Sequence, residues 1–187
     1  MPRTALRRLG RRRVFDGRIL SLDVDRVRLP NGRVAEMELV RHRGSVVLIP
    51  EPGPGRVILV RQFRYVIGRW IWELPAGSLE EGEAPGRAAR RECAEEVGLA
   101  PGRIERLGTL YPTPGFCSER MIFYRCSDLR VPRRPAPRDP DEELEPRAFP
   151  VAEIRRMVAR GEIVDMKTVV GLHLMSARPS TRDGRRR

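Results

Sequence analysis

Alternating apolar and polar positions predict short strands in the first 44 residues of the chain. Residues 14–22 and 23–29 alternate, and residues 34–40 return with a looser alternation. Between the last two runs, Pro30-Asn31-Gly32 predicts a hairpin turn, because Asn-Gly accommodates positive φ angles. This three-stranded module has few large apolar residues and could hardly fold alone. It therefore needs a surface to lie on, either the rest of the chain or a second subunit.

Longer apolar runs begin at residue 45 and predict a core. The continuous run at residues 45–50 is typical of a buried strand. Further strands are expected at residues 56–63, 71–74, 104–111 and 121–126, with a last strand end at 149–151. Amphipathic helices are expected at residues 151–160 and 165–177. Strands mixed with flanking helices predict an α/β (α+β) fold built in layers.

The stretch from Gly77 to Leu99 combines acidic and helix-forming residues, with six Glu and three Arg in 23 residues. Pro85 suits the first turn of a helix, and Gly98 stands where a glycine would end it. At about 100° per residue, one face of this helix carries three carboxylates and the next face is apolar. The acidic face consists of Glu92, Glu95 and Glu96, and the apolar stripe of Ala89, Cys93 and Val97.

Carboxylates one helical turn apart repel each other by roughly 0.2–0.5 kcal/mol per pair, so the acidic face fits either solvent or a bound cation. Glu83 precedes the helix, and Gly77 and Gly82 allow tight backbone geometry beside it. Carboxylates and a backbone carbonyl that converge in this way form an all-oxygen environment. Such an environment suits Mg²⁺ or Mn²⁺ rather than zinc.

The spacing of this stretch resembles the complete Nudix box. Gly77 is followed after five residues by Glu83, and after seven more by Arg91-Glu92-Cys93-Ala94-Glu95-Glu96-Val97-Gly98-Leu99. Every fixed Gly, Glu and Arg of the box is present, and Cys93 stands where an aliphatic residue is usual. The match favours a bound cation over a solvated face. It implies a Nudix α/β/α sandwich with a mixed sheet, preceded here by a small N-terminal antiparallel β module.

Outside the box, the chain from about residue 15 to 177 resembles the ADP-ribose pyrophosphatase branch of this family. The matching segments are Phe15–Arg18, Asn31–Arg33, Val40–Gly44, Val60–Arg64, Glu73–Gly77, the closing-helix segments Gly161–Ile163 and Asp165–Leu172, and the turn Pro114-Gly115-Phe116, which marks the branch. In that branch the N-terminal strands exchange across a two-fold axis, so the resemblance implies a homodimer. The domains expected are a disordered basic tail at 1–13, the dimerising β module at 14–44, the catalytic domain at 45–177 and a second basic tail at 178–187.

The resemblance also implies roles for the residues of the box. Glu92 and Glu96 would be the principal metal ligands, with Glu95 and the Ala76 carbonyl completing the cluster. Glu83 would be a ligand or its hydrogen-bond partner, and Arg91 an ion pair that orients the carboxylates. The cofactor implied is Mg²⁺, or Mn²⁺, with two or three ions per site.

A second acidic cluster, at residues 141–145, has two interpretations. The branch takes its general base from a mobile acidic loop, and the register of the following strand places Glu142 there, with Glu143 one residue away. The alternative is a solvated acidic turn. With two His in the chain, catalysis by histidine has little support.

Substrate contacts are expected on the strand before the box. Arg61 and Arg64 could hold phosphates, because guanidinium groups bind them bidentately; an exposed strand end is the alternative. Trp70 or Trp72 could stack on a base or cap the pocket, although tryptophans are more often core residues. The resemblance adds further substrate-binding positions: Glu73, Gly77, Pro114, Gly115 and Phe116.

Composition narrows the cellular setting. The formal net charge is +12, and of 37 basic residues Lys167 alone is lysine. Much of the excess lies at residues 3–13 and 178–187, which favours solvated tails over nucleic-acid binding. The chain has no apolar run near 18 residues and no signal-peptide pattern, so neither a membrane partner nor export is expected. Cys93, Cys117 and Cys126 lack metal-ligand spacing and indicate the reducing cytoplasm.

Three functions are consistent with the sequence. The favoured one is metal-dependent hydrolysis of ADP-ribose to AMP and ribose 5-phosphate. The second keeps the enzyme class and changes the substrate to GDP-mannose, another nucleoside diphosphate sugar or a dinucleotide polyphosphate. The third is a Nudix-fold regulator that binds nucleotides or nucleic acid, supported by the positive charge and opposed by the intact set of box carboxylates.

Overall fold

The computed structural model describes residues 5–134, 136 and 143–177. The chain divides into two compact units, which we treat separately. The small unit comprises Met1–Gly44 and Leu110–Met121, and the large unit comprises Ser45–Thr109 and Ile122–Arg187. None of the described helices combines the length and hydropathy needed to cross a membrane.

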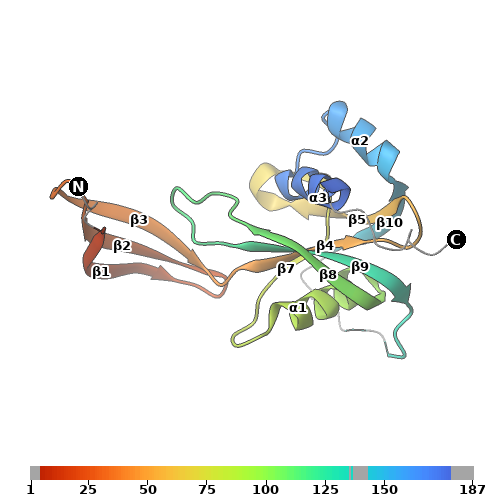
Figure 1. Ribbon diagram of the computed structural model, residues 1–187, viewed down its shortest axis with the longest axis horizontal. Helices are drawn as coiled ribbons and strands as arrows, with labels where there is room; N and C mark the ends of the chain where they lie inside the picture. The colour runs from red at the N-terminus through yellow and green to blue at the C-terminus, as the bar shows by residue number, and fades with distance from the viewer. Residues whose placement is uncertain (1–4, 135, 137–142, 178–187) are drawn as a thin grey trace, which may run out of the picture. The chain divides into compact units, whose positions relative to one another are not determined.

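The small unit is an antiparallel sheet of three strands in the order β1-β2-β3 (Figure 1). Its strands are β1 (Arg7–Asp16), β2 (Leu20–Arg28) and β3 (Val34–His42). The predicted hairpin turn is present, with Gly32 at a φ of 83°. The segment after residue 110 joins the sheet through β3, because Val40 N donates a hydrogen bond to Phe116 O at 2.8 Å.

Strand β1 corrects the prediction that residues 1–13 form a disordered tail, since residues 7–13 belong to it. The reason is ion pairing across the sheet. Asp23 and Asp25 of β2 are buried, and Arg11 and Arg13 of β1 pair with them, together with Arg41 of β3. An arginine run without apolar periodicity is thus held by carboxylates that follow it in the sequence. The predicted tail at 178–187 lies outside the described residues.

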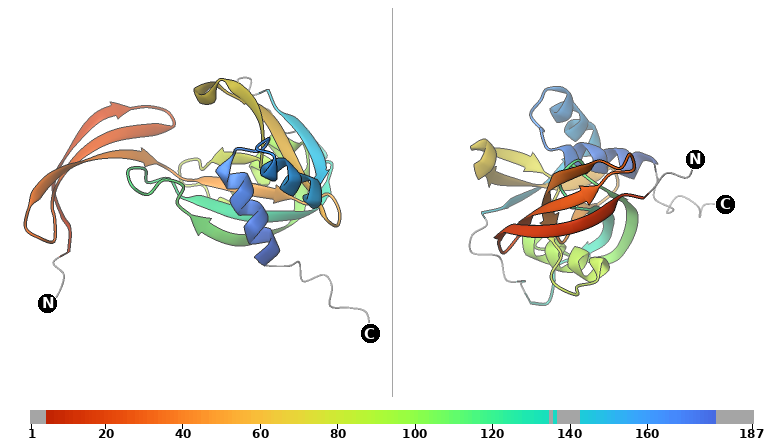
Figure 2. Two further views of the ribbon diagram at one scale, coloured as in Figure 1. Left: turned by 90° about the horizontal axis from the view of Figure 1, so that it is seen from above. Right: turned by 90° about the vertical axis from the view of Figure 1, so that its left-hand side faces the viewer.

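The large unit contains two sheets, with strand orders β10-β5-β6 and β7-β4-β9-β8. Helix α1 lies on one side of these sheets, and α2 and α3 lie on the other (Figures 1 and 2). This arrangement of the described residues agrees with the predicted layering. The elements are β4 (Ser45–Pro50), β5 (Arg56–Arg64), β6 (Arg69–Glu73), β7 (Ala76–Ser78), α1 (Pro85–Glu92), β8 (Ala100–Leu110), β9 (Met121–Arg130), β10 (Glu145–Pro150), α2 (Val151–Ala159) and α3 (Met166–Ala177).

The core of the large unit joins α1 to the sheets. Ala89, Cys93 and Val97, the predicted apolar stripe, are buried in one cluster with Val46 and Leu48 of β4. Burial of a continuous apolar stripe is the main source of stability for a helix this short. The orientation of the acidic face follows from it.

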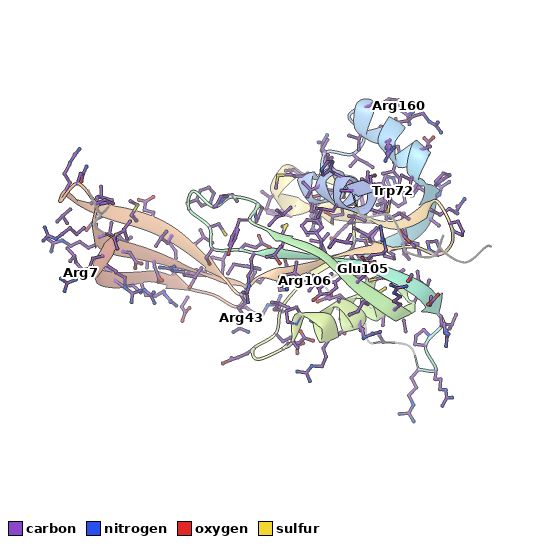
Figure 3. All side chains as sticks on the ribbon, viewed as in Figure 1. Arg7, Arg43, Trp72, Glu105, Arg106 and Arg160 are labelled. Atoms are coloured by element: carbon purple, nitrogen blue, oxygen red, sulfur yellow. The ribbon has the colours of Figure 1, made fainter. Side chains whose placement is uncertain are left out.

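The two tryptophans of β6 have different environments. Trp72 packs edge-on against Phe149 of β10, with ring centroids 4.9 Å apart, in agreement with the core interpretation (Trp72 is labelled in Figure 3). Trp70 is 38% exposed and lies against Phe63. The Arg61 guanidinium stands over its ring, 5.3 Å from the centroid.

Candidate active site

The acidic face is carried by α1 and the turn that follows it. Pro85 is the first helical residue, and beyond Glu92 the helix widens into a π-type turn at Cys93–Val97. Gly98, with a φ of 75°, ends it in the left-handed conformation. The side chains of Glu92 and Glu96 are turned inward.

Glu92 and Glu96 lie against the backbone of β7, although carboxylates are rarely buried. Glu96 Oε2 accepts a hydrogen bond from Ala76 N at 3.1 Å. A Cβ atom at Gly77 would lie 1.9 Å from the Glu92 Cδ atom, so only glycine permits this approach. The position of the Glu92 carboxylate in α1 therefore requires a glycine at position 77 in β7.

Arg91 is the centre of a dense ion-pair network. Its Nη1 atom lies 2.7 Å from Glu92 Oε1 and 2.9 Å from Glu95 Oε2, and its Nη2 atom lies 2.9 Å from Glu83 Oε2. These hydrogen bonds raise the pKa of Arg91 further, and the bonds from Arg91 hold the pKa of Glu83 below its usual range. The predicted ion pair between Arg91 and Glu95 is present.

The donor set suits a hard divalent cation. In this arrangement Glu83, Glu92 and Glu95 turn toward Arg91, and no group of three acidic, His or Cys side chains in the described ranges is gathered tightly enough to hold a metal ion. Even so, two buried carboxylates beside the Ala76 backbone supply oxygen donors of the kind that Mg²⁺ prefers. A hollow of about 360 Å³ opens beside Arg91 and is lined by Glu80, Glu81, Glu83, Arg87, Arg90 and Arg91.

Arg61 and Arg64 point to opposite faces of the β5–β6 hairpin, although both were expected to hold phosphates. Cross-strand partners share a face, and Arg61 pairs with Trp72 whereas Val60 pairs with Glu73. Arg64 therefore lies on the Glu73 face, where its Nη2 atom is 2.6 Å from Glu73 Oε1. Arg61 lies on the Trp70 face and approaches Glu145 at 3.5 Å.

The remaining predicted site residues belong to other parts of the chain. Glu142 lies outside the described residues, and Glu143 is exposed just before β10. Pro114, Gly115 and Phe116 belong to the small unit, where Phe116 is 56% exposed.

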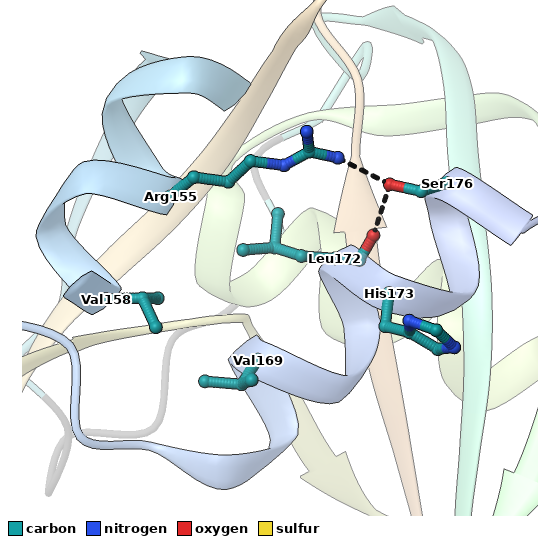
Figure 4. Close-up of a pocket in the computed structure, with 6 residues that line it drawn as sticks. All are labelled: Arg155, Val158, Val169, Leu172, His173 and Ser176. Atoms are coloured by element: carbon teal, nitrogen blue, oxygen red, sulfur yellow. Dashed lines mark hydrogen bonds between the residues drawn. The ribbon is translucent and has the colours of Figure 1, made fainter.

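A separate hollow of about 290 Å³ lies between α2 and α3 and contains none of the predicted site residues (Figure 4). Arg155 Nη2 donates to Ser176 Oγ at 2.7 Å, and Ser176 Oγ donates to Leu172 O at 2.9 Å. The first of these bonds links the two helices, and the second lies within α3.

Sequence reasoning missed a buried ion pair between Lys167 and Glu73. Lys167 Nζ lies 2.5 Å from Glu73 Oε2, and the Lys167 side chain is 8% exposed. One signal pointed to this residue, because Lys167 is the only lysine among 37 basic residues. Burial could not be read from it, since a lysine near a helix start is usually a surface residue.

Comparison with known proteins agrees with this architecture. Residues 40–168 match the NUDIX domain, and residues 7–37 match the nucleoside diphosphate sugar hydrolase N-terminal domain. The chain is 32% identical to the ADP-ribose pyrophosphatase of Bacillus subtilis (strain 168), covering 89% of this chain and 90% of that protein. It is 38% identical to the ADP-ribose pyrophosphatase of Mycobacterium tuberculosis (strain ATCC 25618 / H37Rv), covering 83% and 76%.

A solved structure described as an ADP compounds hydrolase superposes with a TM-score of 0.80, covering 93% of this chain and 94% of that one at 21% identity. This likeness confirms the fold. The matched domain spans most of the chain and includes α1, its carboxylates and the glycine that makes room for them. The chain therefore belongs to the Nudix family.

Proposed function

We propose that this protein hydrolyses the pyrophosphate bond of ADP-ribose, giving AMP and ribose 5-phosphate. The observation that carries the proposal is the pair of buried carboxylates, Glu92 and Glu96, held against the Ala76–Gly77 backbone. The substrate is taken from the two ADP-ribose pyrophosphatases that the chain resembles over most of its length.

The reaction joins a water oxygen to one phosphorus and breaks the bond from that phosphorus to the bridging oxygen, while the water loses a proton to a base. Divalent ions, when bound, neutralise the pyrophosphate, polarise the phosphoryl group and lower the pKa of the attacking water. We propose Mg²⁺, with Mn²⁺ as a substitute, in two or three sites held by Glu92, Glu96 and the Ala76 carbonyl. Glu95 and Glu83 would complete the set.

Two residues have proposed roles around this centre. Arg91 keeps the carboxylates in position by pairing with Glu83, Glu92 and Glu95. Proton removal belongs to the acidic loop, at Glu142 or Glu143. Glu143 is exposed, as a residue on a closing loop would be before substrate binds.

Arg64 is the favoured phosphate ligand of the two arginines. It shares its face of β5 with Ile58, which packs in the same core cluster as α1. Its side chain is 41% exposed, so donors remain open to an oxyanion. Arg61 stacks on Trp70 on the other face.

We propose a homodimer formed through the small unit. A three-stranded sheet with little core of its own is marginal in water. The small unit exposes a set of large apolar side chains: Leu6, Leu9, Val14, Phe15, Ile19, Leu20 and Val34. A second copy of the chain would cover them. The three free cysteines fit the cytoplasm as the setting for this dimer.

The test is product release from ADP-ribose, GDP-mannose, UDP-glucose, NADH and diadenosine polyphosphates with Mg²⁺. ADP-ribose should lead by tenfold or more in kcat/KM, which is about 1.4 kcal/mol of discrimination. Glu96→Gln is the control and should lower kcat by about 1,000-fold, because a metal ligand supplies several kcal/mol.

A higher kcat/KM with another sugar nucleotide would show that ADP-ribose is not the preferred substrate, while the enzyme class would stand. Absence of turnover with every compound, in wild type and Glu96→Gln alike, would overturn catalysis and favour the nucleotide-binding regulator.

A further inference from the structure

Lys167, near the start of α3, is the feature that the proposed function leaves unexplained. Its side chain is 8% exposed, and its ammonium group lies between two carboxylates. The Nζ atom is 2.5 Å from Glu73 Oε2 and 3.1 Å from Asp165 Oδ1. A buried cation needs such partners, because burial without them is strongly unfavourable.

Glu73 also forms an ion pair with Arg64. Its side chain is 2% exposed, and each of its oxygens meets a different cation: Oε2 meets Lys167 and Oε1 meets Arg64 Nη2 at 2.6 Å. The three charged groups form a line from the buried end of α3 to the partly exposed end of β5. Only the last member, Arg64, is open enough to meet a ligand.

The position of Lys167 is fixed by the start of α3. Asp165 Oδ2 accepts a hydrogen bond from Thr168 N at 2.9 Å, as a capping residue does. Thr168 Oγ1 accepts a hydrogen bond from Leu74 N at 2.8 Å, which ties the helix to the residue after Glu73. Asp165 therefore both caps α3 and pairs with the Lys167 ammonium group, while Thr168 holds the start of the helix beside Glu73.

We infer that Lys167 is a positioning residue, which acts through Glu73 to hold the Arg64 guanidinium ready for the phosphates of the substrate. The inference rests on the proposed function only in giving Arg64 a phosphate to bind. A free arginine side chain loses much rotamer entropy when it is ordered. Anchoring one nitrogen on Glu73 removes that loss from the binding step and leaves the other N–H donors available.

A double-mutant cycle separates this role from a merely structural one. Lys167→Met should raise KM for ADP-ribose about tenfold while kcat changes less than threefold. The reason is that Arg64 would bind the substrate phosphates equally well in the ground state and in the transition state. Arg64→Ala should raise KM by the same factor or more. If Lys167 acts through Arg64, the double variant should match Arg64→Ala alone.

Two controls complete the cycle. Lys167→Arg keeps a cation beside Glu73 and should return KM to within about threefold of wild type. Arg155→Met removes a cation from α2, away from the network, and should leave KM unchanged. If Lys167→Met does not fold, Glu73→Gln breaks the same line at its middle and enters the cycle in its place.

The outcomes are distinguishable. If the increase in KM of the double variant equals the product of the increases in Lys167→Met and Arg64→Ala, then Lys167 acts independently of Arg64. That result would overturn the inference. An unchanged KM in Arg64→Ala, with turnover still dependent on Glu96, would also overturn it and leave the proposed function standing. Turnover that survives Glu96→Gln would remove the proposed function itself.

Discussion

Two clusters of arginine and carboxylate stand in this chain, with different stoichiometry. In the small unit, three arginines surround two buried aspartates: Arg11 and Arg13 from β1 and Arg41 from β3 enclose Asp23 and Asp25. Strands on both sides of β2 supply the positive charge. Arg13 also pairs with the exposed Asp16, so the cluster is neutral, from three arginines minus three aspartates.

In the large unit, one arginine serves several carboxylates. Glu83, Glu92 and Glu95 lie within 3 Å of Arg91, and Glu80 approaches it at 3.8 Å. The net charge of these five groups is −3, from one arginine minus four glutamates. The same ion-pair chemistry therefore serves two purposes. Balanced arginines and aspartates hold a sheet together, whereas the cluster around Arg91 has an excess of carboxylate, which would attract cations.

The largest expected effect concerns the close approach of backbone and carboxylate. Gly77→Ala should lower kcat by about 100-fold or more, because a Cβ atom 1.9 Å from Glu92 Cδ must displace Glu92, a proposed metal ligand. The matched control is Gly10→Ala in β1, where a Cβ atom meets nothing within 4 Å. That variant should keep full turnover. Equal activity of the two variants in a steady-state assay would contradict the geometry of the box.

A moderate effect should separate the two clusters by sign. Asp23→Asn removes an anion from among three arginines and should lower the Tm measured in EDTA. Glu95→Gln removes an anion from the acid-rich cluster and should leave the Tm equal or higher, because it relieves repulsion between carboxylates. Thermal denaturation of both variants beside wild type measures this. A fall in Tm for both would show that the stoichiometry does not decide the sign.

The smallest effect is a pH dependence of stability at Glu83. Hydrogen bonds from Arg91 lower the pKa of Glu83, so its contribution to stability is complete above the usual Glu range, about pH 4–5, and is lost as the pH falls through the lower folded pKa. In EDTA, the Tm of wild type should therefore fall more steeply than that of Glu83→Gln between about pH 5 and pH 3. Parallel curves would mean that the pair contributes nothing.

The pKa of Asp23 is also lowered in the folded protein, so its contribution to stability should likewise be lost as the pH falls, although the causes of the shift are balanced differently. Burial raises its pKa, and hydrogen bonds from Arg13 and Arg41 outweigh burial and lower it. The acid sensitivity of both units therefore comes from carboxylates held by arginine.

Most of the fold could be predicted because periodicity marks elements that bury apolar faces. The apolar stripe of Ala89, Cys93 and Val97 gave both the helix and its orientation, and the structure confirms it. Residues 7–13 of strand β1 could not be found in this way. They carry no apolar alternation, and their partners, Asp23 and Asp25, follow them on the next strand.

The box residues were predictable because their spacing is fixed within one helix and the loop before it. The faces on which Arg61 and Arg64 lie were not predictable. Side chains three residues apart on a strand point to opposite faces, and only the register with β6 shows which face each arginine occupies. Lys167 was beyond reach for a related reason. Its contact with Glu73 joins residues 94 positions apart.

The backbone hydrogen bond between Val40 and Phe116 has a consequence for the construction of chimeras between homologues. The small unit is discontinuous in sequence, and β3 is hydrogen-bonded to a segment encoded far downstream, with Ser118 N donating to Val40 O at 2.9 Å. A chimera joined after Gly44 would inherit the strands from one parent and the Pro114–Phe116 turn from the other. Exchange of the whole unit between homologues therefore requires three junctions, after Gly44, before Leu110 and after Met121.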